Sequence, residues 1–387
     1  MQKVLIVCEQ NMATVELLRT TLGRLFPDGT LISFKCVRDI SERDIEECDI
    51  LFMTRSFDIL SKMIADEARK AGVFTAFYLD DDLISFAGRS FFEKRRCNAL
   101  LATLEAAEVF LTPCRALLEK YGKRSKCPAI LDTIVSAGEI CANERSNTNP
   151  VKIVFAAGHG HEKPFEDYVV PILSKLGERF GAGISLTFIG VAPKLPQDYP
   201  FEVRFIDHMS FDEYRDYMRH EKFDIGLAPL LGTSFDSCKY HNKYIEYSLA
   251  GCAGIYSDCK PFSYVISNAV NGILAKNSPD DWYEAIERAV FDKELRQNCL
   301  EGACKDLIER QSAKAVRETL LKEVPGLFEY RRTSEKKVSL GFTKYKYRFW
   351  VNIEYFTRVW KVLTKDGLPG LWKKVLRHIK NSKAIHS

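Results

Sequence analysis

Three charged residues lie at a spacing that suits an anionic ligand. Lys239 and Lys243 are four residues apart, and Glu246 follows Lys243 by three. In an α-helix these intervals place side chains on one face. A helix that begins near 236–239 also directs free backbone N–H groups and the positive end of its dipole toward a diphosphate. One turn further on, a carboxylate can accept the paired hydroxyls of a ribose. The alternative is a solvated helix face with ion pairs between neighbouring turns.

A second candidate segment is FAAGHGHEKPF, residues 155–165, which follows an apolar run. Its glycines allow the backbone to approach a ligand closely, and its histidines and lysine supply donors beside it. We therefore expect this loop to contact the same anionic ligand through Gly158, His159, Gly160, His161 and Lys163. A plain turn is the alternative interpretation.

Three consecutive carboxylates, Asp80, Asp81 and Asp82, close another apolar run. Like charges repel, so a fold gains nothing from them at a strand end unless they have a function. We expect Asp80 and Asp81 to orient or deprotonate an acceptor hydroxyl, with Asp82 and Arg55 beside them on the acceptor side. A helix N-cap cluster ahead of 83–86 is the alternative.

These aspartates could also be read as a metal-binding Asp-x-Asp motif. We prefer a mechanism without metal or other cofactor, because positive side chains and a helix dipole can neutralise a departing diphosphate. The twelve cysteines contain no CxxC pair and the seven histidines no HExxH spacing, which favours reduced core thiols over a metal site.

The elements that must position these residues alternate between short apolar runs and helix-like stretches. In the first half they are 3–8, 13–25, 31–37, 49–54, 60–71, 74–79, 91–107 and 109–112. After a polar connector they are 151–156, 165–180, 185–189, 203–206, 211–219, 225–228, 240–250 and 253–256. This pattern predicts an α/β protein with two doubly wound, Rossmann-like domains. Such sheets bind ligands beyond the carboxyl ends of their strands, so the site is expected in the cleft between the domains.

We expect four segments along the chain. They are a first domain over 1–145, a second domain over 151–312, a crossing helix over 313–330 and a tail over 331–387.

Residues 223–282 resemble the donor-binding domain of GT-B glycosyltransferases. The resemblance rests on FDIGLAPLLGTSFDSCKYHNKYIEYSLAGCAGIYSD and on the following VISNAVNGIL, which is similar to the family's turn before its last strand. It covers about 150–310 well, the first half only by architecture and the tail weakly. Among these enzymes the chain is most similar to the retaining, family 4-like, group 1 type.

The resemblance implies that the domain over 1–145 is on the acceptor side and that the domain over 151–312 binds the nucleotide sugar. It also implies that Glu246 binds the ribose, while Lys163, Lys239 and Lys243 stabilise the diphosphate. The chain departs from the family at Cys238, where a glutamate is usual, and has histidine in place of arginine after Gly158.

The implied function is transfer of a sugar, with retention, from a nucleoside diphosphate to a hydroxyl of a lipid-linked or cell-surface polysaccharide precursor. A sugar-nucleotide epimerase of the same architecture and a catalytically silent membrane adaptor are the alternatives.

The tail differs in character from the rest of the chain. From Arg331 onward there are fifteen Lys and Arg against three Asp and Glu, although the net charge is only +4. Aromatic and aliphatic residues recur there at helical spacing, a pattern typical of helices that lie on anionic membranes. RNA binding and packing onto the first domain are the alternatives, and we expect no nucleic-acid partner.

No run of about 18 apolar residues is present, and the opening MQKVLIVCEQ is too short for a signal peptide. We therefore expect a cytoplasmic protein attached peripherally to the inner face of the membrane, from which a cut after Tyr330 would release two folded domains.

Overall fold

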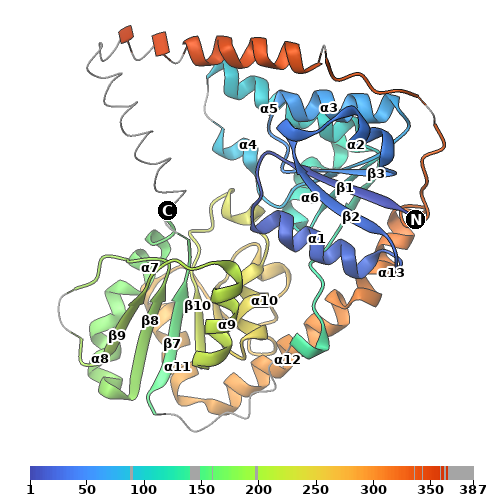
Figure 1. Ribbon diagram of the computed structural model, residues 1–387. Coiled ribbons are helices and arrows are strands. Elements are labelled where there is room, and N and C mark those ends of the chain that lie inside the picture. Colours follow the sequence, from blue (N-terminus) through green and yellow to red (C-terminus); the bar gives the residue numbers. More distant parts are fainter. Residues whose placement is uncertain are drawn as a thin grey trace.

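The computed structural model describes residues 1–87, 90–139, 149–158, 160–196, 199–334, 336–341, 343–357, 359–360 and 363–364. These residues contain two α/β domains, each built on a six-stranded parallel sheet (Figure 1). The predicted fold class is confirmed. His159 of the glycine-histidine loop lies outside the described residues.

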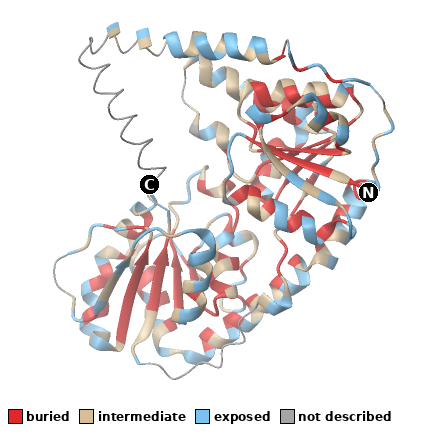
Figure 2. Cartoon of the chain, viewed as in Figure 1, coloured by how far each residue is buried: buried red, intermediate tan, exposed pale blue. Residues whose placement is uncertain are grey.

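The first domain has the strand order β2-β1-β3-β4-β5-β6. Its strands are β1 (Lys3–Cys8), β2 (Leu31–Cys36), β3 (Ile50–Thr54), β4 (Phe74–Tyr78), β5 (Val109–Thr112) and β6 (Pro128–Ile130). Its helices are α1 (Ala13–Leu25), α2 (Glu42–Glu47), α3 (Ile59–Lys70), α4 (Leu83–Phe86), α5 (Phe91–Ala106) and α6 (Arg115–Tyr121). Residues of α3, α5 and α6 pack on one face of the sheet, and residues of α1 on the other. The central strands are buried on both faces, which explains their continuous apolar sequences (Figure 2).

The second domain has the strand order β12-β11-β10-β7-β8-β9. Its strands are β7 (Val151–Ala156), β8 (Ile184–Ile189), β9 (Glu202–Ile206), β10 (Ile225–Ala228), β11 (Ala253–Ser257) and β12 (Ile273–Ala275). Its helices are α7 (Lys163–Tyr168), α8 (Leu173–Phe180), α9 (Phe211–Glu221), α10 (Asn242–Leu249), α11 (Pro279–Phe291) and α12 (Lys293–Gln311). Residues of α7, α8 and α11 cover one face, and residues of α9, α10 and α12 the other.

Some predicted elements differ from the observed ones. The predicted helix over 165–180 is divided into α7 and α8 by a 3-10 turn at Val170–Ile172, where Pro171 cannot continue an α-helical hydrogen-bond ladder. The sequence analysis missed α6 and β6 altogether. Both are short, and β6 begins with a proline at the sheet edge, where a strand needs no amide donor on its outer side.

After α12, the chain returns to the first domain through α13 (Ala313–Glu323). Ser312 ends α12 in an extended conformation and caps α13 with its side chain. Val316 and Leu320 of α13 are buried against the core that α1 also covers, and Phe328 packs edge-on against Phe26 at 5.0 Å.

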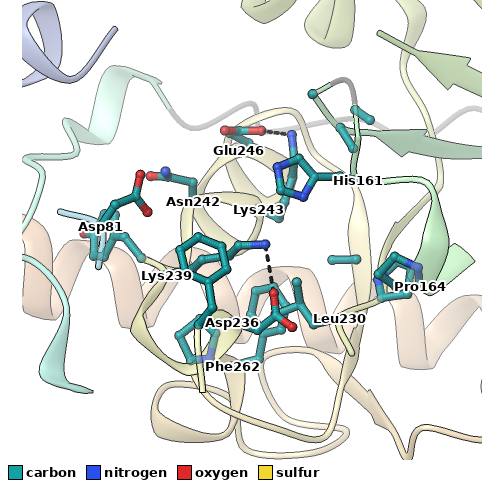
Figure 3. A pocket seen from close by; sticks show the side chains of 18 of the residues that line it. Asp81, His161, Pro164, Leu230, Asp236, Lys239, Asn242, Lys243, Glu246 and Phe262 are labelled. Atoms are coloured by element: carbon teal, nitrogen blue, oxygen red, sulfur yellow. Dashed lines mark hydrogen bonds and ion pairs between the residues drawn. The ribbon is translucent and has the colours of Figure 1, made fainter. Parts of the chain in front are cut away.

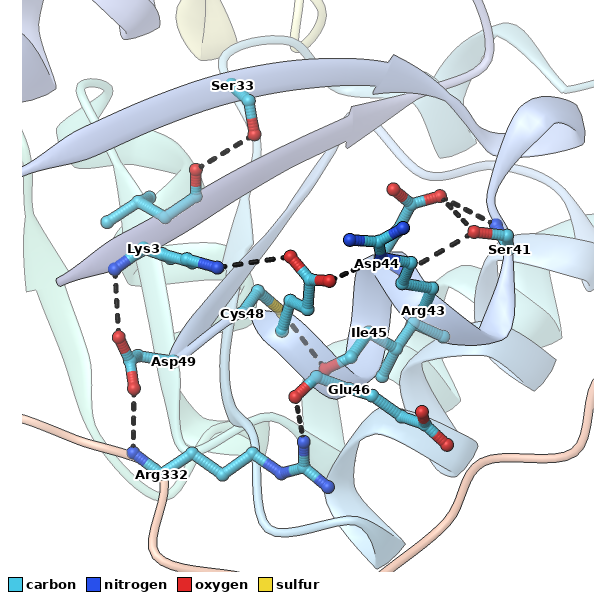
Figure 4. Close-up of polar contacts among 12 residues, drawn as sticks. Lys3, Ser33, Ser41, Arg43, Asp44, Ile45, Glu46, Cys48, Asp49 and Arg332 are labelled. Carbon is cyan, nitrogen blue, oxygen red and sulfur yellow. Dashed lines mark hydrogen bonds and ion pairs between the residues drawn. The ribbon is translucent and has the colours of Figure 1, made fainter. Parts of the chain in front are cut away.

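The segment that follows is bound to the first domain. Arg332 donates its backbone N–H to Asp49 Oδ1 at 2.9 Å and its guanidinium to the carbonyl oxygen of Glu46 (Figure 4). The same guanidinium also donates to the carbonyl oxygen of Ala71. Val338 and Leu340 belong to the core of that domain, with exposed fractions of 7% and 1%. The expectation that residues from 331 onward are separable from the folded domains is therefore wrong, because side chains of this segment complete a core.

Beyond it, residues 343–357 are helical and lie over α3 and α5 (Figure 1). Across the described ranges, no helix combines the length and the apolar character that crossing a bilayer requires.

Candidate active site in the interdomain cleft

The carboxyl edges of the two sheets face a shared cavity of about 600 Å³. Its walls come from α1 and the loop after β4 in the first domain, and from the loops after β7 and β10 and the start of α10 in the second. Most of the predicted site residues line it. They are Asp80, Asp81, Gly158, Gly160, His161, Lys163, Lys239, Lys243 and Glu246.

The two lysines reach this cavity from different elements. Residues 236–238 form a 3-10 turn, capped by a hydrogen bond from the amide of Asp236 to Thr233 Oγ1 at 3.1 Å. Lys239 is then extended, with φ −75° and ψ 152°, so α10 begins only at Asn242. The prediction that Lys239 and Lys243 share one helical face is wrong, because the backbone leaves the helical region between them. The cavity nevertheless brings them together.

Lys239 is held by Asp236, with Nζ and Oδ1 2.9 Å apart, and its ammonium lies 5.2 Å from the centre of the Phe235 ring. Burial opposes ionisation of Asp236, but the hydrogen bond and charge of Lys239 outweigh it and lower the pKa of Asp236. Figure 3 shows Lys239 between Asp81 of the first domain and Asp236 of the second. A cation in this position can contact ligand groups that approach from either domain.

Glu246 is oriented by two donors on the same oxygen. Lys243 Nζ donates to Glu246 Oε2, and the hydroxyl of Tyr214, from α9, donates to it at 3.0 Å. Within the described ranges Glu246 Oε1 has no hydrogen-bond partner, and the side chain is 21% exposed. This carboxylate is therefore fixed in place with one oxygen available to a hydroxyl in the cavity.

The glycine-histidine loop turns sharply before α7, with Gly160 at φ +87°. The backbone N–H of His161 donates to the carbonyl of Gly158 at 3.3 Å, which directs the imidazole toward Lys239 and Lys243 (Figure 3). Desolvation and the charge of Lys239 lower the pKa of His161. His161 is therefore poised to gain a proton when an anion enters.

Lys163 borders the cavity, but its ammonium is committed elsewhere. As the first residue of α7 it pairs with Asp167 one turn later, both Nζ–Oδ distances being 2.8 Å, and it is 66% exposed. The structure does not bring this ammonium together with those of Lys239 and Lys243.

On the acceptor side, Arg55 joins the two aspartates that line the cavity. Its Nη1 lies 3.0 Å from Asp80 Oδ1 and 2.9 Å from Asp81 Oδ2, and Thr14 Oγ1 donates to Asp80 Oδ2 at 2.6 Å. Arg55 itself has a left-handed backbone, at φ +48°. Burial, followed by the charge of Asp80, raises the pKa of Asp81 in spite of Arg55. Asp81 is thus the more basic kind of carboxylate that a proton acceptor requires.

Asp82 does not belong to this group. Its side chain is fully buried, caps α4 through the amide of Ser85 and accepts hydrogen bonds from Lys120 and from the Tyr121 hydroxyl, the latter at 2.6 Å. Burial opposes ionisation of Asp82, but the hydrogen bonds from Lys120, Ser85 and Tyr121 outweigh it, so that the pKa of Asp82 is lowered. The acceptor-side prediction for Asp82 is wrong, and the N-cap alternative describes it.

Cys238, which stands where a glutamate was expected from the resemblance, is turned away from the cavity. It is 5% exposed and packs into the core of the first domain, while the neighbouring thiol of Cys114 lies 3.4 Å from the carbonyl oxygen of Lys239. This position serves contact between the domains.

The sequence analysis missed Tyr240, which lines the cavity next to the points where the chain passes between domains. Its hydroxyl donates to Asp132 Oδ1 at 3.1 Å and accepts from the amide of Thr133 at 3.3 Å and from Gln311 Nε2 at 3.2 Å. Burial raises the pKa of Asp132 to about 6. A tyrosine at the first position of a predicted helix carries no signal of this role, because its partners are distant in sequence.

No family model and no curated protein matches the chain. Solved structures do. HepE from Anabaena in complex with UDP-glucose matches with a TM-score of 0.61 and 10% identity, over 84% of this chain and 100% of that one. Sucrose-phosphate synthase from Thermosynechococcus elongatus matches with a TM-score of 0.60 and 11% identity, over 85% and 99%.

Trehalose-6-phosphate synthase from E. coli, bound with UDP-2-fluoro glucose, matches with a TM-score of 0.56 and 12% identity, over 83% of this chain and 98% of that one. All three are GT-B glycosyltransferases. The protein therefore has the GT-B fold, two Rossmann-like domains that face one cleft.

Proposed function

We propose that this protein is a glycosyltransferase that moves a sugar from a nucleoside diphosphate to an acceptor hydroxyl. The observation that carries the proposal is the shared cavity, in which two lysines, a histidine and an oriented carboxylate of the second domain face two aspartates of the first. Two structural neighbours, HepE and the E. coli protein, are bound to UDP-glucose and UDP-2-fluoro glucose, which supports a donor of this class.

In this proposal the donor lies against the second domain. Lys239, Lys243 and protonated His161 contact the diphosphate, and Glu246 Oε1 accepts a ribose hydroxyl. As the bond from the anomeric carbon to the diphosphate oxygen breaks, negative charge grows on the leaving group. The lysines stabilise that charge more in the transition state than in the ground state.

The acceptor enters from the first domain. Asp81 receives the hydroxyl proton as the acceptor oxygen bonds to the anomeric carbon, while Arg55 and Thr14 hold the paired aspartates in place. Lys163 and the described loop glycines border the donor and shape its entry. Closure of the two domains over the cleft then aligns the donor and the acceptor for reaction.

We propose further that lysine charges replace a metal ion in this reaction. Turnover should then persist in EDTA, and strict dependence on Mg²⁺ or Mn²⁺ would instead support Asp80 and Asp81 as ligands.

We also propose retention at the anomeric carbon and an acceptor that belongs to a lipid-linked or cell-surface polysaccharide precursor at the inner face of a membrane. The support for a membrane-borne acceptor is the basic, aromatic tail, with fifteen Lys and Arg against three Asp and Glu from Arg331 onward.

The first experiment is a thermal-shift screen of nucleoside diphosphates and their sugars, followed by measurement of slow sugar-nucleotide hydrolysis without acceptor. A ligand at about 100 times its Kd stabilises the folded state by about 2.7 kcal/mol. Binding without any hydrolysis or transfer would favour a silent adaptor, and conversion of the donor into an epimeric sugar nucleotide would favour an epimerase.

A further inference from the structure

The helical part of the tail packs against the first domain through three side chains. The hydroxyl of Tyr347 donates to Asp58 Oδ2 at 3.0 Å, and Arg96 Nη2 lies 3.0 Å from both carboxylate oxygens of Glu354. Between these contacts, the Trp350 ring stacks against the guanidinium of Arg95, whose Cζ lies 3.5 Å from the ring centre. The three anchoring side chains recur at intervals of three and four, so they define the inner face of this helix.

The opposite face of the helix is aromatic. Five rings there are 55% to 69% exposed, and we call them the outer aromatic ridge. They are Tyr345, Phe349, Tyr355, Phe356 and Trp360. A helix that rests on a soluble domain normally presents polar residues to water, so a ridge of this kind marks a surface that another phase or molecule covers.

The charges beside the ridge indicate what that cover is. Lys344 and Lys346 lie on opposite flanks of the helix, and Arg348 is exposed next to the rings. Tyrosine and tryptophan favour the interface of a bilayer, and basic side chains favour anionic lipid headgroups. A second copy of this chain would bring two strongly basic tails together, which like-charge repulsion opposes.

We propose that the outer aromatic ridge is a membrane-docking surface that seats the first domain on an anionic bilayer. This inference rests on the proposed function, since a membrane-borne acceptor requires the acceptor side of the cleft to face the lipid. The contacts fit that requirement. Tyr347 binds Asp58, the N-cap of α3, only three residues after Arg55 of the acceptor-side cluster. The contacts of Tyr347, Trp350 and Glu354 with the first domain therefore set the orientation of the cleft relative to the bilayer.

The test is co-sedimentation of the full chain with vesicles of phosphatidylcholine that contain phosphatidylglycerol, compared with phosphatidylcholine alone. The chain should bind the anionic vesicles, less tightly as salt rises. The triple variant Phe349→Ser, Phe356→Ser, Trp360→Ser should bind about tenfold more weakly or worse. A matched control is Phe205→Ser with Phe291→Ser, which removes rings of similar exposure, 52% and 59%, from the second domain. This control should bind like the unchanged chain.

Equal sedimentation of the ridge variant and the unchanged chain would overturn the proposal. So would light scattering that shows a dimer for the unchanged chain and a monomer for the ridge variant, because the ridge would then join two copies. A charge variant, Lys346→Gln with Arg348→Gln, gives an independent measure and should weaken binding to anionic vesicles only. Donor-induced thermal shifts should be unchanged in all variants. Absence of donor binding in the unchanged chain would refute the proposed function while leaving the docking result intact.

Discussion

Glu246 is the residue whose geometry most limits its possible roles. Its Oε2 is taken by Lys243 and Tyr214, so a ligand hydroxyl has only Oε1 to approach. Glu246→Gln replaces one acceptor by a mixed donor and acceptor group and also weakens the pair with Lys243.

We expect Glu246→Gln to weaken nucleoside diphosphate binding by about 1–3 kcal/mol in calorimetric titration. Glu309→Gln, at an exposed position that pairs loosely with Lys305 at 3.9 Å, is the control and should not change the Kd. An unchanged Kd for Glu246→Gln would remove this carboxylate from the ribose site.

The lysines allow a comparison within one cavity wall. Lys239→Ala and Lys243→Ala should lower kcat about tenfold or more and affect the donor Kd less, because charge on the leaving diphosphate grows toward the transition state. Lys163→Ala should have a smaller effect on kcat, since the Lys163 side chain is 66% exposed whereas those of Lys239 and Lys243 are 21% and 27% exposed. If Lys163→Ala lowers kcat as much as Lys239→Ala does, the described position of the Lys163 side chain is not the one it has during the reaction.

His161 makes a pH dependence testable. Desolvation and Lys239 depress its pKa, whereas a bound diphosphate should favour the imidazolium and raise it. Between the two pKa values, binding takes up a proton, so donor affinity should rise as pH falls through this window. Calorimetry in two buffers of different ionisation enthalpy measures the uptake. His161→Gln should abolish it, and an uptake that persists in this variant would point to another group.

At the scale of elements, Tyr240 connects the start of α10 to both passages between the domains. One passage contributes Asp132 and Thr133, and the other contributes Gln311 at the end of α12. The same hydroxyl therefore connects the start of α10 to both segments that join the two domains.

Tyr240→Phe should lower the free energy of unfolding by about 1–3 kcal/mol, because it leaves buried polar partners unpaired. It should also lower kcat more than donor affinity, since the donor contacts remain while the domains lose a shared contact. Urea unfolding and steady-state kinetics measure these effects. Tyr199→Phe, whose hydroxyl donates to the carbonyl oxygen of the nearby Pro196, is the control. Equal kinetics for both variants would reduce Tyr240 to a packing residue.

At the scale of the whole molecule, the tail is part of the first domain as well as the carrier of the ridge. A chain that ends at Tyr330 loses Arg332, Val338 and Leu340, two of which are core residues. We expect this truncation to be less stable by about 2–5 kcal/mol in urea. A chain that ends at Thr364 keeps all three and should match the full chain. Equal stability of the two truncations would show that the segment from 331 contributes nothing to the core.

Much of this organisation is legible in the sequence. Strands buried on both faces have continuous apolar runs, so β1, β5, β7 and β10 were predicted with their observed bounds, and the paired doubly wound domains followed. The segment around Glu246 and the pair Asp80 and Asp81 could be assigned to the cleft, since residues after parallel strands meet at one sheet edge.

Only the tertiary structure decided which of these side chains face the cavity. Asp81 and Asp82 are neighbours in sequence, yet one lies in the cleft beside Arg55 and the other is buried against Tyr121. Lys163 and Lys239 both pair with a carboxylate one turn away, and they differ in exposure, 66% for Lys163 and 21% for Lys239. The tail is fixed by contacts between residues more than 250 positions apart. Sequence patterns report local periodicity and burial, whereas the direction of a side chain at a strand end and the partner of a distant charge depend on packing between elements.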